Sequence, residues 1–179
     1  MKPHIMIDVE TLGIGNNACL LSLAGVKFDP NNPTYETLDE FHVAIDPDSC
    51  IRLGMTVTGA TILWWMHPDR AAAREKLLSA ERIDLASVLD GFSLWFGGRS
   101  LPTWGNGSTF DNVIVRNAYG LISRECPWTY KDDCCFRTFR KIVPTMEVPR
   151  DGVIHDALDD ARAQAFLLKD IVAFLRMVL

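Results

Sequence analysis

The first residues of the chain alternate in a way that constrains the fold more than any other part of the sequence. Ile5, Ile7 and Val9 would lie on one face of a β-strand, because successive side chains of a strand point to opposite sides. Asp8 and Glu10 interrupt the opposite face. Two carboxylates at one strand end repel each other, and a divalent cation is the simplest group that would offset this repulsion. A solvated strand end is the alternative interpretation.

Apolar periodicity predicts where the other strands and helices lie. Short alternating or continuously apolar runs indicate strands, whereas apolar residues spaced three and four apart indicate helices. The order of elements predicts an α/β fold with an antiparallel meander in a mixed central sheet. We expect strands over His4–Val9, Cys19–Phe28 and Phe41–Ile45, a helix over Leu85–Phe96 that Gly97 ends, a strand over Leu101–Trp104, a helix over Phe110–Tyr119 that Gly120 ends, and a last helix after the N-cap residue Asp156.

Length and composition predict a single globular domain. The 179 residues are 48% hydrophobic and 23% charged, and the longest apolar run, 62–66, is far too short to cross a membrane. Asp8 comes too early for a signal peptide, and five cysteines without a C-x-x-C pair favour reduced thiols, so we expect a cytoplasmic protein. The net charge, 18 − 23 = −5, argues against a protein that coats nucleic acid. It does not exclude an enzyme that holds nucleic acid through metal ions.

Two further segments carry acids that structure alone does not require. Asp111 follows a glycine-rich turn, 105–110, and opens a predicted helix. The segment His155–Asp160 places one histidine and three acids at the start of the last helix. Each segment also has a structural interpretation, since acids at a helix start complement its dipole and a lone histidine is more often structural than catalytic.

Taken in order, the three segments resemble a known family. D-x-E at Asp8 and Glu10, N-x-x-x-F-D ending at Asp111, and H-x-x-x-x-D from His155 to Asp160 are similar to the motifs of the DEDDh branch of RNase H-like 3′-5′ exonucleases. The resemblance extends over nearly the whole chain and is strongest to compact bacterial and phage single-domain exonucleases. It implies an RNase H-like sheet that adds parallel strands to the meander and is flanked by helices, in one exonuclease domain over residues 1–179. The DEDDy branch has tyrosine where Asp156 stands.

The resemblance implies a reaction as well as a fold. Asp8, Glu10, Asp111 and Asp160 would hold two divalent cations, Mg²⁺ or Mn²⁺, which suit oxygen ligands. His155 would act as the general base. Five residues apart on one continuous helix, it and Asp160 would diverge by about 140°, so we expect His155 in the loop before the helix. The expected substrate is the 3′ end of single-stranded DNA or RNA, cleaved to nucleoside 5′-monophosphates, and the resemblance also implies a homodimer.

Substrate contacts are predicted at several positions outside the acids. They are Thr11, Leu12 and Asn106, one of the adjacent Trp64 and Trp65 as a stacking face for a base, and Arg137 for phosphate. Neighbouring helical residues point about 100° apart, so one tryptophan should be buried and the other exposed, and core burial is the alternative for each. The basic residues Lys131, Arg137, Arg140 and Lys141 would alternatively form a solvated helix face paired with Asp132 and Asp133.

Two other functions compete with the exonuclease. An endonuclease or transposase core of the same fold would not require His155. A nucleic-acid-binding or interaction module that retains the fold without catalysis would not require all five of the residues at the predicted site. The sequence does not distinguish DNA from RNA as substrate.

Overall fold

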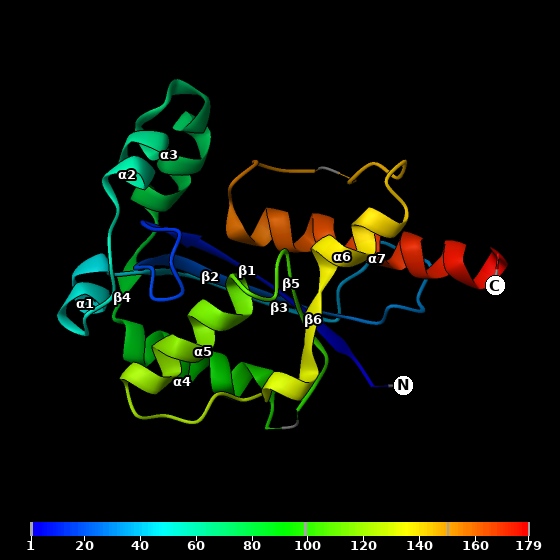
Figure 1. The fold of residues 1–179 in the computed structure, drawn as a ribbon, viewed down its shortest axis with the longest axis horizontal. Coiled ribbons are helices and arrows are strands. Elements are labelled where there is room, and N and C mark those ends of the chain that lie inside the picture. Colours follow the sequence, from blue (N-terminus) through cyan, green and yellow to red (C-terminus); the bar gives the residue numbers. More distant parts are fainter. Residues whose placement is uncertain (1, 99, 150, 179) are drawn as a thin grey trace.

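The computed structural model describes residues 2–98, 100–149 and 151–178, and their centre is a six-stranded sheet with the order β4-β3-β2-β1-β5-β6 (Figure 1). The strands β1, β2 and β3 form the antiparallel meander, and β4, β5 and β6 are parallel to the strands beside them. The predicted mixed sheet is therefore confirmed. The strands are β1 His4–Thr11, β2 Leu20–Phe28, β3 Asp39–Ile45, β4 Arg82–Ile83, β5 Thr103–Gly105 and β6 Asp133–Cys135.

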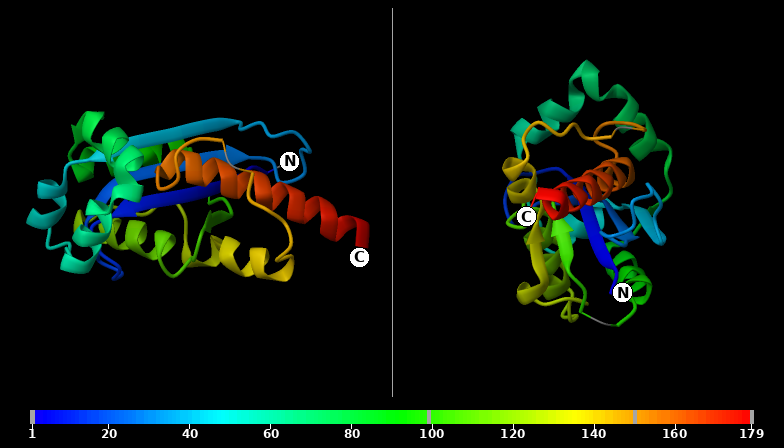
Figure 2. Two further views of the ribbon diagram at one scale, coloured as in Figure 1. Left: turned by 90° about the horizontal axis from the view of Figure 1, so that it is seen from above. Right: turned by 90° about the vertical axis from the view of Figure 1, so that its right-hand side faces the viewer.

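Helices cover both faces of the sheet. The helix α7 crosses one face over β1 and β2, while α4 and α5 pack on the other, as the two rotated views show (Figure 2). The helices α2 and α3 stand out from the sheet beside the start of α7; we call residues 59–79 the α2–α3 arm. The helices are α1 Pro47–Arg52, α2 Gly59–Met66, α3 Ala71–Ser79, α4 Leu85–Phe96, α5 Asp111–Leu121, α6 Phe136–Ile142 and α7 Ala157–Val178, with 3₁₀ turns at Pro68–Arg70 and Tyr130–Asp132.

The alternation of β1 divides the core into two clusters. Ile5 and Ile7 pack with residues of α4 and α5, and Met6 packs on the opposite face with residues of α6 and α7. Asp8 and Glu10 follow Met6 on this second face. Because β1 and β5 are parallel neighbours, their carboxyl ends lie at the same edge of the sheet. The fold thus places both acids beside the turn that leads from β5 into α5.

The predicted long elements are confirmed, with one error at a helix end. Gly97 ends α4 in the left-handed conformation (φ +92°). Gly120 does not end α5, which continues to Leu121; the left-handed residue is instead Ser123 (φ +55°), and Arg124 N–H donates to the carbonyl of Tyr119. Periodicity did not predict several short elements, each of nine residues or fewer: β4, β6, α1, α2, α3 and α6. Within the described part of the chain, no helix has the length and apolar character needed to span a bilayer.

Candidate active site

Four carboxylates and one histidine from three parts of the fold line a single pocket of about 250 Å³. Asp8 and Glu10 come from the end of β1, Asp111 is the first residue of α5, Asp160 lies in the first turn of α7, and His155 precedes that helix. The three acids from β1 and α5 are buried, each at most 8% exposed. The predicted site residues thus meet in space although they are spread over more than 150 positions.

Asp111 reaches the pocket because Gly105 leaves room for it. A methyl group on Gly105 would lie 2.9 Å from Asp111 Cβ and 2.4 Å from Oδ1 of Asn112, which are both impossible contacts. The Asn112 side chain donates to the carbonyl of Thr103 at 2.9 Å and to Oδ1 of Asp133 at 3.0 Å. These bonds fasten the start of α5 to the first residues of β5 and β6, so the position of Asp111 is set by the sheet.

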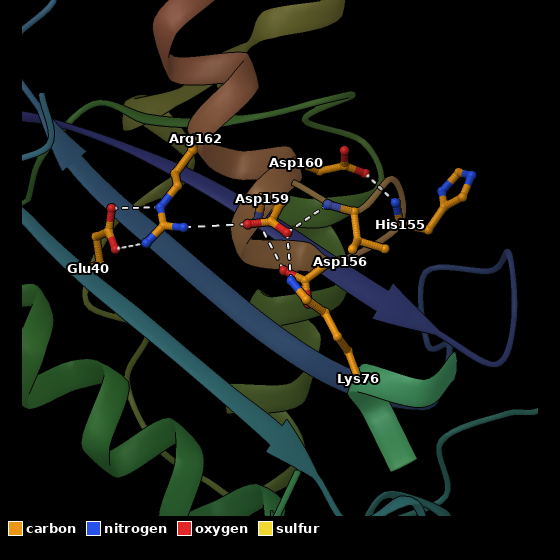
Figure 3. Close-up of polar contacts among 8 residues, drawn as sticks. Glu40, Lys76, His155, Asp156, Asp159, Asp160 and Arg162 are labelled. Atoms are coloured by element: carbon orange, nitrogen blue, oxygen red, sulfur yellow. Dashed lines mark hydrogen bonds and ion pairs between the residues drawn. The ribbon is translucent and has the colours of Figure 1, made fainter. Parts of the chain in front are cut away.

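His155 lies in a tight turn before α7, as predicted. Its backbone is left-handed (φ +68°), which is uncommon for a residue other than glycine and often marks a functional site. Its N–H donates to Asp160 Oδ2 at 3.1 Å (Figure 3). Asp156 Oδ1 accepts from the N–H of Asp159 at 3.1 Å, which confirms Asp156 as the N-cap of the helix. The histidine side chain is therefore not the cap.

Burial and mutual repulsion make the carboxylates hard to ionise. Burial raises the pKa of Asp8 well above its ordinary value, and the charges of Asp111, Glu10 and Asp160 add to the effect. Burial is also the main cause that raises the pKa of Glu10, and the charges of Asp160 and Asp111 raise it further. For Asp111, burial raises the pKa to about 7 although the Arg137 charge opposes it. An apposed cation would reverse each of these shifts.

The donor set fits divalent cations. Asp111 Oδ2 is buried and has no hydrogen-bond partner among the described residues, so it retains a free acceptor. Ligand atoms of Glu10, His155 and Asp160 lie within 4.8 Å of one another. Clustered carboxylate oxygens are the ligands that Mg²⁺ and Mn²⁺ prefer. The residues present therefore suit a metal site.

A second, more apolar pocket of about 390 Å³ adjoins the first and shares Val9, Glu10 and Phe110 with it. As predicted, the two tryptophans differ. Trp65 is 6% exposed and its Nε1 donates to the Thr11 carbonyl, whereas Trp64 is 39% exposed and meets the His155 ring edge-on at 4.8 Å between centroids. Thr11 and both tryptophans line this pocket.

Leu12 is not among the residues that line these two pockets and lies in a third hollow, which Leu21, Trp65 and Leu77 also line. The structure therefore places Thr11 next to the acids and Leu12 away from them.

Basic side chains border the acidic pocket. Arg137 and Arg140 of α6 line it together with Asn106, whose carbonyl accepts from Arg137 Nη2. Neither arginine pairs with Asp132 or Asp133 among the contacts that the described residues make, because Asp133 pairs with Arg116 at 2.6 Å. The ion-paired helix face considered from the sequence is therefore not what forms here.

Gln164 is a site residue that the sequence prediction missed. Its Nε2 donates to Asp8 Oδ1 at 2.8 Å, and it lines the pocket beside Asp160. The two residues are four apart on α7 and so share one face of the helix. That spacing is the signal that could have identified Gln164 once Asp160 was assigned.

Comparisons with known proteins agree with this fold and identify a family. A family model described as a 3′-5′ exoribonuclease Rv2179c-like domain matches residues 3–172. An exodeoxyribonuclease of Enterobacteria phage T4 is 25% identical over 196 residues, covering 92% of this chain and 86% of that protein. Two solved structures share the fold: E. coli exonuclease I with a dT13 oligonucleotide (TM-score 0.71, 14% identity, 99% of this chain and 42% of that one) and an exonuclease I from Methylocaldum szegediense (TM-score 0.62, 17% identity, 97% and 41%). The chain spans less than half the length of these exonuclease I chains.

Proposed function

Because the chain belongs to the 3′-5′ exoribonuclease Rv2179c-like domain family, we propose that it is a metal-dependent 3′-5′ exonuclease that releases nucleoside 5′-monophosphates from single-stranded nucleic acid. One observation carries the proposal: Asp8, Glu10, Asp111 and Asp160 line one pocket with His155. Acids gathered in this way destabilise the metal-free protein, so their convergence is best explained by the cations they would bind.

In the proposed mechanism the four carboxylates hold two Mg²⁺ or Mn²⁺ ions. When bound, such cations polarise the phosphate under attack and stabilise the charge on the leaving oxygen. Gln164 donates to Oδ1 of Asp8 and so holds this carboxylate in the lining of the pocket. The unpartnered Asp111 Oδ2 is a free acceptor that this assignment uses.

We assign His155 the role of general base. One of its ring nitrogens lies within 4.8 Å of carboxylate oxygens of Glu10 and Asp160, so it would be near a water molecule held at these acids. The unprotonated nitrogen of an imidazole can accept a proton from an attacking water molecule. His155 therefore takes the proton as the water oxygen attacks phosphorus, and the bond to the 3′-oxygen of the remaining strand breaks.

The apolar pocket is the proposed site for the terminal base. Trp64 is 39% exposed and lines this pocket, so we assign it as the stacking surface, and such stacking contributes about 1–3 kcal/mol per base. Thr11 lines the same pocket. Arg137 and Asn106 border the acids and would contact the phosphates of the strand that enters. E. coli exonuclease I is described with a bound dT13 oligonucleotide, which supports a single-stranded substrate.

The test is digestion of matched DNA and RNA oligonucleotides that carry a 5′ label. We expect a ladder that shortens from the 3′ end and yields nucleoside 5′-monophosphates. Chelation should abolish the ladder, Mg²⁺ or Mn²⁺ should restore it, and Ca²⁺ should not, since the reacting complex requires tight octahedral geometry. Full cleavage in excess chelator would refute the metal mechanism, and internal cuts would refute the exonuclease.

A further inference from the structure

A lysine of the α2–α3 arm reaches across to the first turn of α7. Lys76 Nζ lies 2.6 Å from Asp159 Oδ2 and 3.4 Å from Asp156 Oδ2 (Figure 3). The two carboxylates are 11% and 7% exposed, whereas the lysine side chain is 45% exposed. None of these three residues is among those to which the proposed reaction assigns a role, yet they surround the turn that carries His155.

Asp159 organises this turn. Its Oδ2 accepts from the backbone N–H of Val153 at 2.9 Å as well as from Lys76, and its Oδ1 lies 3.4 Å from Arg162. Gly152 is left-handed (φ +123°), and a methyl group there would lie 2.4 Å from Asp159 Cγ. The turn therefore closes tightly around the Asp159 carboxylate. The residue that donates to this carboxylate, Val153, is two residues before His155.

The arm touches the same turn at a second point. The ring of Trp64 contacts the ring of His155, and Arg70 stacks on Trp64 with its guanidinium 4.4 Å from the ring centroid. Arg74 holds the end of α2 by donating to the carbonyl of His67 at 2.7 Å. Lys76 and Trp64 are thus parts of one braced segment, and both contact the segment 152–160.

We propose that Lys76 is a positioning residue for His155. Its ammonium lies between Asp156 and Asp159 and fixes the turn 152–155 against the α2–α3 arm, which holds the His155 ring against Trp64 and toward Glu10 and Asp160. Without this cation, two nearly buried carboxylates would repel each other beside the metal-binding acids. The turn would then be free to move, and a displacement of about 1 Å at a catalytic group is enough to slow a reaction severely.

The inference rests on the proposed role of His155, and it can be tested without turnover. The ring current of Trp64 should shift the proton resonances of the His155 imidazole. His155→Ala identifies that signal among the four histidines. In Lys76→Met, which keeps the length of the side chain, the signal should move toward the value of an exposed histidine. In Lys76→Arg, which keeps the charge, it should stay near its original position.

Kinetics should show the same dependence. Lys76→Met should lower kcat about tenfold, while KM and the Kd for Mn²⁺ change less than about twofold, because Lys76 is not among the residues that line the acidic or the apolar pocket. Asp159→Asn should have a similar effect, and the double variant should be no slower than the slower single variant. Arg124→Met is the matched control, since Arg124 forms an ion pair with Asp90 at 3.2 Å away from the site. It removes the same charge and should leave kcat unchanged.

Three results would overturn the proposal: an unshifted His155 signal in Lys76→Met, additive effects in the double variant, or an equal loss in Arg124→Met. If the His155 signal moves but the wild type does not cleave oligonucleotides, the positioning contact stands and the proposed function fails. If the wild type cleaves and the signal does not move, the function stands and the positioning role of Lys76 fails.

Discussion

On one face of β1, Ile5 and Ile7 are completely buried among apolar side chains of α4 and α5, whereas the other face passes from the buried Met6 to the carboxylates of Asp8 and Glu10. Both faces belong to the same eight-residue strand, and these residues are buried on both. Burial of the first face stabilises the fold, but burial of two acids on the second face opposes it in the absence of a cation. A strand can therefore be optimised for packing on one side and for chemistry on the other.

Asp8→Asn should have the largest effect on turnover and should not destabilise the metal-free protein. Turnover should be lost because a proposed metal ligand is missing, while the metal-free protein should melt at the same temperature or higher, since one of four repelling acids has been neutralised. The Asn carbonyl can still accept from Gln164, so the helix contact is retained. Added Mn²⁺ should raise the melting temperature of the wild type more than that of the variant. Equal shifts in thermal melts would exclude Asp8 as a ligand.

His155→Ala should have the next largest effect. Loss of a general base lowers kcat by about 10²–10⁴-fold. The Kd for Mn²⁺ and binding of a single strand should change little, because the four carboxylates remain. Single-turnover rates and metal titrations measure the two quantities separately. If His155 were a ligand, as its distance from Glu10 and Asp160 also allows, metal affinity would fall and excess Mn²⁺ would restore the rate.

Gly105→Ala should lower the rate of the enzyme although it removes no functional group. The added methyl group would force Asp111 and Asn112 away from the end of β5. We expect kcat to fall roughly tenfold to a hundredfold as one metal ligand is displaced, together with a loss of thermal stability. Gly120→Ala is the control, because it lies on a helix and a methyl group there meets no atom within 4 Å. A variant at Gly105 with the activity of the wild type would show that Asp111 is not held by this contact.

Asp111 was predictable from the sequence, whereas the role of Gly105 beside it was not. The long strands and helices were predictable because their burial imposes a period of two or of three to four residues, and the five pocket residues because the motifs name them. Strands of two and three residues, β4 and β6, carry no period. The clearance over Gly105 and the contact of Lys76 with Asp159, 83 residues apart, arise only when the elements pack.

The free energy of unfolding of the metal-free protein should fall with rising pH because of the buried acids Asp8 and Asp111. Burial raises the pKa of Asp111 to about 7, and that of Asp8 is also raised, whereas acids in the unfolded chain ionise near pH 4. The folded state therefore binds more protons in this interval, so the free energy of unfolding falls as the pH rises from about 4 to about 7. Melting temperatures in chelator should follow this fall, and Asp8→Asn should make it shallower. A rising curve would contradict the assignment of these acids.

The smallest effect on kcat should come from a substitution on the face of β1 that packs on α4 and α5. Ile7→Val removes one methylene from a fully buried side chain directly before Asp8 in the sequence. It should cost about 0.5–1.5 kcal/mol of unfolding free energy, which lowers the melting temperature of a domain of this size by a few degrees. The value of kcat, measured well below the melting temperature, should stay within about twofold of the wild type, because the backbone of β1 keeps its pairing with β2 through Gly25 and its register with β5.

Ile7→Val and Asp8→Asn therefore form a matched pair of neighbours with opposite expected results: one loses stability and keeps turnover, and the other keeps stability and loses turnover. Denaturant unfolding and single-turnover cleavage on the same two samples measure both quantities. If a folded Ile7→Val protein lost kcat as strongly as Gly105→Ala, the apolar packing on α4 and α5 would be setting the positions of the acids through the strand. The two faces of β1 would then be mechanically coupled, and the pocket geometry would depend on core packing as much as on the turns around α5 and α7.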